Sequence, residues 1–165
     1  MATPTSLPAT FVAGNVLTAA QMNALRGAFR ILQVVQATDG TQRTTTSTSF
    51  VDASISVTIT PTSADSDVML IWAFGQNNFG GNPERGIFQI TDSSDVAISG
   101  AEYVVSGTGG ANDFRGAVVL IGYDSPATTS ATTYKGRFRS AGTGGTTTSV
   151  NGGNTGQLFA LEISA

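Results

Sequence analysis

The sequence predicts an all-β fold, an antiparallel jelly roll or β-sandwich knob preceded by a short N-terminal arm and helix. Three observations favour this class. Short segments with alternating apolar and hydroxyl residues recur along the 165 residues, and glycine-rich joints separate them. Strands and helices do not alternate, which disfavours a parallel α/β fold. About ten such segments in one chain are typical of sandwiches, jelly rolls and small barrels.

The composition excludes several kinds of chemistry. Histidine and cysteine are absent, which removes His-based acid–base catalysis, Ser–His and Cys–His nucleophiles, and zinc sites built on imidazole or thiolate. Charged residues make up only 12%, and 24 threonines and 16 serines replace them toward water. The net charge of −3, without a basic run, argues against nucleic-acid binding. We therefore expect no enzymatic activity and no cofactor.

Residues 1–30 predict an attachment arm that ends in a short helix. Pro4 and Pro8 favour an extended start, and Thr18 with Gln21 forms a capping box that begins the helix. Apolar residues then recur at helical spacing, and a helix this short needs a partner surface. The residues that we assign to attachment or to a trimer seam are Phe11, Leu17, Met22, Leu25, Phe29 and Leu32.

Residues 31–165 predict the β-sandwich knob, because the apolar period changes to two after the helix. Strands are expected over residues 31–36, 55–60, 68–74, 86–91, 96–99, 102–106, 114–123, 132–139, 146–150 and 158–164. Residues 39–49 and 75–86 are expected to be loops. Val68–Phe74 is apolar on both faces and predicts a central strand with Trp72 in the core. We expect the opposite sheet to cover one face, and either a sister subunit or the docked helix to cover the other. This longest apolar run is too short to span a bilayer, so we expect no membrane partner.

Two groups of side chains are candidates for contact with a ligand or a neighbouring subunit. Lys135, Arg137 and Arg139 fall on one face of a predicted strand, where they form either an anion-binding row or a solvated face paired with nearby acids. Asn77, Asn78 and Phe79 lie in the predicted loop over residues 75–86. Amides beside an exposed ring could contact a saccharide, or could simply solvate the turn.

Glycine-rich loops and paired aspartates carry weaker alternatives. The GTGG segments at 107–110 and 142–145 lack the Lys-Ser/Thr pair and the helix of a phosphate-binding loop, and hairpin turns explain them. Asp65 with Asp67, and Asp92 with Asp95, lie in predicted loops. Capping of their own turns is the expected role, and Ca²⁺ binding is the alternative.

Two segments resemble phage virion proteins. Residues 8–25, PATFVAGNVLTAAQMNAL, are similar to the opening of small phage structural and fibre-like proteins. The residues that carry this resemblance are Phe11, Gly14, Leu17, Thr18, Ala19, Met22 and Asn23. Residues 47–74 resemble the first strands of jelly-roll knobs on phage fibres and capsid decorations, and the closing GQLFALEIS resembles their last strand. The residues that carry this second resemblance are Ser49, Phe50, Val51, Asp52, Val57, Thr58, Ile59, Thr60, Pro61, Ser63, Val68 and Leu70.

The resemblance implies a homotrimeric, non-enzymatic virion structural protein. Its knob would sit on the outside of the particle and decorate or cement the capsid, and its arm would hold other capsid or tail proteins. The alternative is a short tail fibre or receptor-binding tip that adheres to host surface glycan. The first residues lack the basic and apolar regions of a secretory signal, so we expect synthesis in the host cytoplasm. A secreted lectin-like module would fit the fold but not this start.

Overall fold

The computed structural model describes residues 31–80, 84–107, 114–141 and 146–164, together with Gly14, Val16, Thr18, Ala19 and Met22 of the N-terminal segment. The described residues form ten strands. They are β1 (Ile31–Asp39), β2 (Arg43–Thr45), β3 (Val51–Ile59), β4 (Asp67–Phe79), β5 (Glu84–Asp92), β6 (Ala97–Gly107), β7 (Phe114–Asp124), β8 (Thr132–Ser140), β9 (Thr147–Val150) and β10 (Gly156–Ile163).

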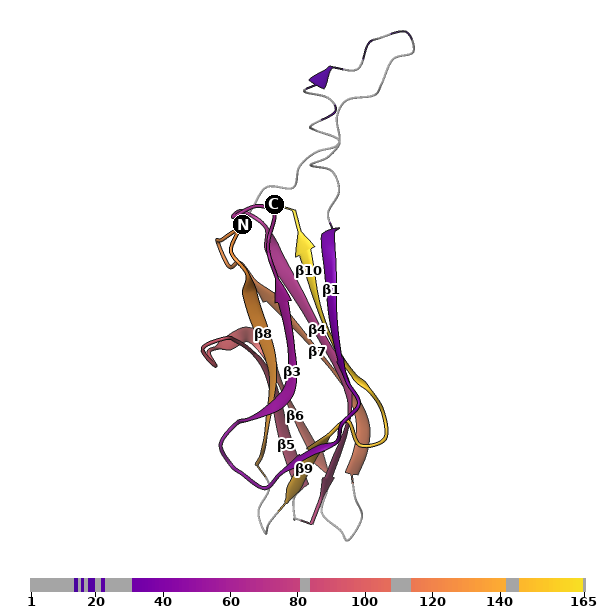
Figure 1. Ribbon diagram of the computed structural model, residues 1–165. Coiled ribbons are helices and arrows are strands. Elements are labelled where there is room, and N and C mark those ends of the chain that lie inside the picture. Colours follow the sequence, from indigo (N-terminus) through magenta and orange to yellow (C-terminus); the bar gives the residue numbers. More distant parts are fainter. Residues whose placement is uncertain are drawn as a thin grey trace.

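These strands build two antiparallel sheets that pack face to face (Figure 1). The first sheet has the order β1-β10-β4-β7, and the second has the order β3-β8-β5-β6. The short strands β2 and β9 continue the positions of β1 and β10, since β9 and β10 pair with successive parts of the same edge of β4. Four strand positions in each sheet, in this order, make an eight-stranded jelly roll. The predicted fold class is confirmed.

The core lies between the sheets and follows from the alternation in each strand. In β3, Ala53, Ile55, Val57 and Ile59 are buried, and the residues between them are exposed. Trp72 of β4 occupies the centre with 1% of its surface exposed, and its ring centroid lies 4.1 Å from that of Phe74. The predicted core position of Trp72 is confirmed.

The strand predictions hold for most of the knob, with three corrections. The loop expected over residues 75–86 is wrong, because β4 continues to Phe79 and β5 begins at Glu84. Backbone pairing on both edges, with β7 and β9, holds this polar end of β4 as a strand. The loop expected over residues 39–49 contains β2, and the strand expected over 102–106 is the second half of β6, whose backbone turns at Gly100 with φ +78°.

The helix expected over residues 18–30 falls largely outside the described residues. Within it, the backbone N–H of Met22 donates to the carbonyl of Thr18 over 3.0 Å, which is one helical hydrogen bond. Leu32 was expected to complete the helical stripe, but it lies in β1, because the chain is already extended and paired with β10 from Ile31. Among the described residues, no helix has the length and apolar character needed to cross a membrane.

Within the described residues of one chain, the cover expected on both faces of Val68–Phe74 is present on one face, and the cover expected from a sister subunit or the docked helix stays a prediction. Val68, Leu70, Trp72 and Phe74 point into the sandwich and are buried. On the opposite face, Met69, Ile71 and Ala73 are half-buried, and no other described element packs over them. A strand with the composition of a doubly covered core strand is therefore left half open to solvent.

Candidate functional site

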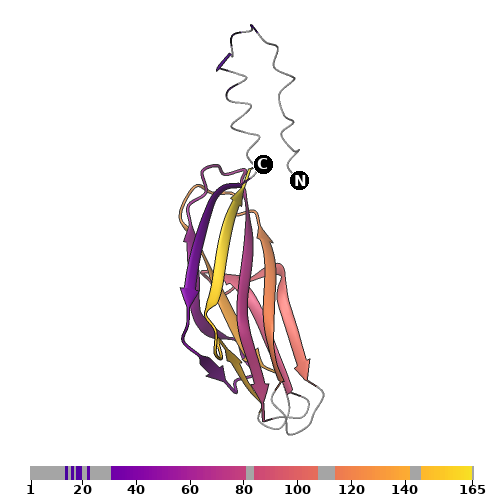
Figure 2. The same ribbon diagram turned by 90° about the vertical axis from the view of Figure 1, so that its right-hand side faces the viewer.

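The open face belongs to the whole sheet β1-β10-β4-β7, and Figure 2 looks onto it. Cross-strand register places its outward side chains in rows. One row is Tyr123, Met69, Leu161 and Val34, and the next is Ile121, Ile71, Phe159 and Gln36. A third row is Val119, Ala73, Gln157 and Thr38. We call these twelve residues the neutral face.

Large apolar side chains of the neutral face are open to solvent. Val34 of β1 is 56% exposed and Val119 of β7 is 57% exposed, and Ile121 and Tyr123 are exposed to a similar degree. The patch crosses four adjacent strands, so it is contiguous and not a scatter of single residues. Contiguous exposed apolar patches on soluble proteins mark contact with other molecules.

The neutral face carries no charged side chain, and charges occur only at its two ends. At the upper end, Tyr123 and Ser125 donate hydroxyl hydrogen bonds to the carboxylate of Asp67. The hydrogen bond to Asp67 raises the pKa of Tyr123 above its ordinary value, and burial adds to this effect. At the lower end, Arg115 of β7 is exposed. The middle of the face therefore offers apolar contact without ionic specificity.

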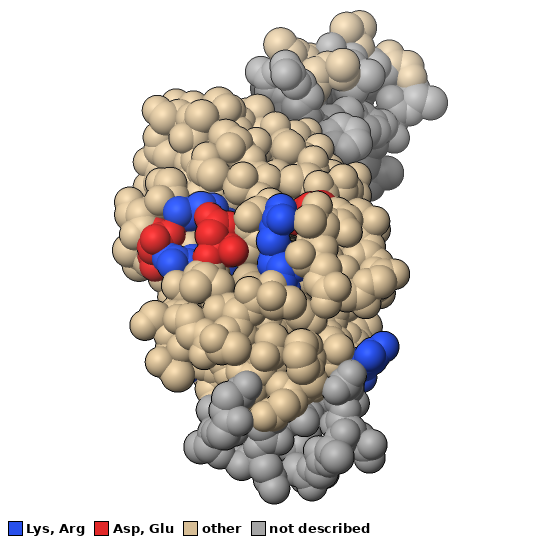
Figure 3. All heavy atoms as spheres, turned by 60° about the horizontal axis from the view of Figure 1, so that its bottom comes forward, with Lys and Arg blue, Asp and Glu red and all other residues tan. Residues whose placement is uncertain are grey.

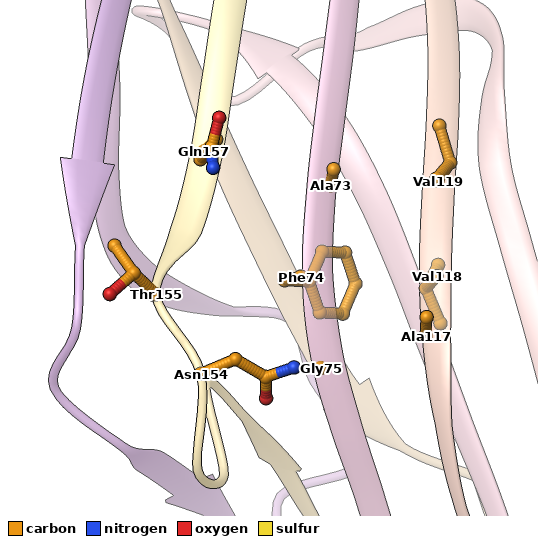
Figure 4. A pocket seen from close by; sticks show the side chains of 9 residues that line it. All are labelled: Ala73, Phe74, Gly75, Ala117, Val118, Val119, Asn154, Thr155 and Gln157. Carbon is orange, nitrogen blue, oxygen red and sulfur yellow. The ribbon is translucent and has the colours of Figure 1, made fainter.

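A depression of about 200 Å³ lies at the lower edge of the neutral face (Figure 4). Ala73, Phe74, Val118 and Val119 contribute apolar lining from β4 and β7, and Asn154 and Gln157 contribute amides. Asn154 extends across Gly75, where a Cβ atom would overlap with its side-chain amide. Glycine at position 75 thus lets the loop before β10 close down on β4.

The opposite sheet carries the predicted row of cations, and it confirms their common face. Lys135, Arg137 and Arg139 of β8 point outward, while Tyr134, Gly136 and Phe138 alternate with them and are buried. Figure 3 shows basic and acidic side chains gathered side by side in a band, with one further basic group apart from it near the lower right edge. The cations of β8 therefore lie on the sheet opposite the neutral face.

Much of this cation row is paired within the chain. Lys135 Nζ lies 2.6 Å from Asp95 Oδ1, and Arg137 forms a second ion pair with the same carboxylate. The hydrogen bond from Lys135 is the main cause that lowers the pKa of Asp95. Burial is the next-largest cause and opposes it, and Arg137 lowers the pKa further. Arg139 stacks over the ring of Phe50 at 5.1 Å. The geometry favours the solvated, internally paired interpretation over an open anion-binding row.

The loop predicted around the amide cluster is wrong, while ligand or neighbour contact by Asn77 and Phe79, which are half-buried, stays a prediction. Asn77, Asn78 and Phe79 form the end of β4, and Asn78 is 0% exposed, so the three residues do not form an exposed saccharide-binding loop. Gln76 and Asn78 are buried at the lower end of β4, and their side-chain amides have no hydrogen-bond partner among the described residues. No sequence pattern separated these inward amides from ordinary loop amides.

The remaining candidates have structural roles or lie outside the described residues. The carboxylate of Asp92 accepts hydrogen bonds from the backbone N–H groups of Ser94 and Val96, which is the expected turn capping. The described residues contain no group of three acids that could hold a metal ion. Of the seam residues, Met22 is exposed and Leu32 lies at the upper end of β1. The structure does not describe Phe11, Leu17, Leu25 and Phe29, and most of both GTGG segments is outside it as well.

Comparison with known proteins adds no assignment to this geometry. No protein-family model matches the chain, and no curated protein matches it either. The sequence places contact residues in the arm, in the cation row and in the amide cluster. It predicts a cover over the outer side of Val68–Phe74, but it does not identify the outward residues of β1, β7 and β10 that complete the neutral face. The sequence contains a signal for that face. Residues 114–123 and 158–164 carry apolar side chains on both sides of their strands, whereas a strand with one solvated side would alternate with polar residues.

Proposed function

We propose that this chain is a non-enzymatic structural protein of a phage virion. Its knob would stand on the exterior of the particle as a homotrimer and decorate or cement the capsid. Residues 1–30 would attach it to other virion proteins. Support comes from the resemblance of residues 8–25 and 47–74 to such proteins and from the jelly-roll order of the strands.

One observation carries the proposal, and it is the chemical contrast between the two outer faces of the sandwich. The neutral face is apolar and uncharged, whereas the sheet with β8 presents paired charges, and β3 presents serine and threonine. A subunit of a surface assembly needs one face for protein contact and another for water. The fold provides both on a single small domain.

The proposal is tested by locating the chain on purified particles. A C-terminal tag labelled with gold should mark the heads in many copies if the protein decorates the capsid. If the protein cements the capsid, the heads of particles that lack the chain should also be less stable to heat. Absence of the tag from every particle fraction would overturn the proposal.

A receptor-binding tip is the second candidate, and the depression beside Gln157 favours it. Two amides bordering an apolar floor are suited to a sugar, which offers hydroxyl groups and an apolar face. The same labelling experiment separates the candidates, since a tip would give a few labels at the tail. Glycan binding that is lost in Asn154→Ala and Gln157→Ala would then support the tip.

A further inference from the structure

We infer that the neutral face is the surface through which copies of this chain bind one another. This deepens the proposed function, because it names the contact surface of the assembly. The occupant to which we commit is a second copy of the chain, and the centre of the contact is the row of Ile121, Ile71 and Phe159.

The first argument is the cost of leaving this face in water. The side chains of Val34, Val119, Ile121 and Tyr123 each expose about half of their surface, although their strands are paired in the sheet. On the opposite sheet, serine, threonine and paired charges occupy the comparable outward positions of β3 and β8. Burial of apolar area is the main driving force for association, and in the described part of the chain only the face of β1-β10-β4-β7 offers it over four adjacent strands.

The second argument is charge, and it favours a copy of the same chain as the partner. Two copies of a charged face would repel each other at every repeated charge, but the neutral face has none between Asp67 and Arg115. A strongly charged partner would find no counter-charge there. When an uncharged face binds its own copy, no like charges repel each other and no charge is left without a counter-charge.

The third argument is where the N-terminal segment joins the knob. Thirty residues precede Ile31, and β1 begins with Ile31 and Leu32 at the upper end of the same sheet. A cyclic assembly with its axis along the strands would bring the start of every β1 to one end. All copies could then attach to one partner through their N-terminal segments.

The alternative occupant is the chain's own N-terminal segment folded back over the sheet. The described residues of that segment give it no support, since Val16 and Met22 are both exposed. Placing that segment on the face would also leave the copies without a shared apolar surface. We therefore treat this alternative as an outcome of the test.

The test compares two matched substitutions in the full chain. Val119→Glu places a carboxylate on the neutral face, and Val104→Glu places it on β6, where Val104 is 48% exposed. The mass in solution is measured by light scattering and sedimentation at micromolar concentration. The wild type and Val104→Glu should give three times 16.8 kDa. Val119→Glu should raise the dissociation constant about 100-fold or more and give folded monomers.

Each outcome decides the inference. Association of Val119→Glu like the wild type would overturn it, and so would a monomeric wild type. A monomeric wild type whose N-terminal segment becomes sensitive to protease in Val119→Glu would identify that segment as the occupant. If Val119→Glu does not fold, as judged by circular dichroism, the uncharged Ile121→Ser replaces it and must show at least tenfold weaker association.

The inference and the proposed function can fail separately. A trimer that dissociates in Val119→Glu but is absent from particles keeps the inference and overturns the virion assignment. If the chain is found on particles but its Val119→Glu variant still forms trimers, the virion assignment is kept and the inference is overturned.

Discussion

The indole of Trp72 in β4 lies against the backbone of Gly136 in β8. A Cβ atom on Gly136 would come within 2.8 Å of Cζ2 of Trp72 and 2.9 Å of Cγ2 of Ile55. Glycine interrupts the large residues Tyr134 and Phe138 on the buried face of β8 so that the largest core side chain can cross between the sheets. Trp72 therefore fits in the core because position 136 is glycine, and Trp72 leaves no space for a side chain at position 136.

We expect Gly136→Ala to lower the free energy of unfolding by about 1–3 kcal/mol, because an added methyl group overpacks a filled core. Gly116→Ala in β7 is the matched control, since its nearest neighbour beyond the adjacent residues, Gln76 Nε2, would lie at an ordinary 3.6 Å. Urea unfolding of the two variants measures the difference. Equal stability of Gly136→Ala and the wild type would show that Trp72 does not fill this space.

Trp72→Ala should cost about 3–5 kcal/mol, because it leaves a cavity at the centre of the sandwich. Val96→Ala is a suitable control, since Val96 lies in an exposed turn and surface changes stay within about 0.5 kcal/mol. Melting curves of the two variants make the comparison, and a Trp72→Ala curve like that of the parent would place Trp72 outside the core.

We expect ordered water to bind the amides of Gln76 and Asn78 in the lower part of the sandwich. A buried amide without a hydrogen bond costs about 1–3 kcal/mol, and internal waters commonly remove that cost. Asn78→Leu should therefore destabilise the fold by about 1–2 kcal/mol. A high-resolution crystal structure should show the waters. A dry site together with a stabilising Asn78→Leu would contradict this prediction.

The carboxylate of Glu162 makes the free energy of unfolding depend on pH. Burial alone would raise its pKa, but hydrogen bonds from Gln33 Nε2, at 2.7 Å, and from Thr62 outweigh burial and lower it below 4.5. A lowered pKa in the folded state stabilises the fold above the unfolded pKa, and this contribution is lost as pH falls through the folded pKa.

The test compares urea unfolding of the wild type and Glu162→Gln at several pH values. The wild type should be more stable by a constant margin above about pH 4.5, and the margin should shrink at lower pH. Asp95→Asn is the control for an exposed carboxylate whose pKa is also lowered. A margin between wild type and Glu162→Gln that does not change with pH would show that Glu162 does not titrate with folding.

A chain that begins at Ile31 should keep its β-type circular dichroism and its cooperative melting, because the buried apolar core extends from Ala53 to Ala160. Under the proposed function, the same chain should no longer join particles. An insoluble product would show that residues 1–30 belong to the core and would contradict the separate arm.

The sequence by itself determined most of the strands of this protein, because alternation of apolar and hydroxyl residues is a local pattern, although β2 and the polar end of β4 were expected to be loops. It predicted the hairpin of β5 and β6, the outward row of Lys135, Arg137 and Arg139, and the buried Trp72. It also predicted capping by Asp92, since an aspartate bonds the backbone a few residues ahead of it.

The tertiary structure alone decided which apolar residues remain uncovered and which polar residues become buried. Ile121 and Leu120 are neighbours of similar character, and only the packing of the two sheets leaves Ile121 in water and Leu120 in the core. Asn78 looked like a loop amide, yet pairing of β4 with β7 and β9 carries it into the interior. Both outcomes depend on contacts between residues far apart in the chain, and a local pattern does not contain that information.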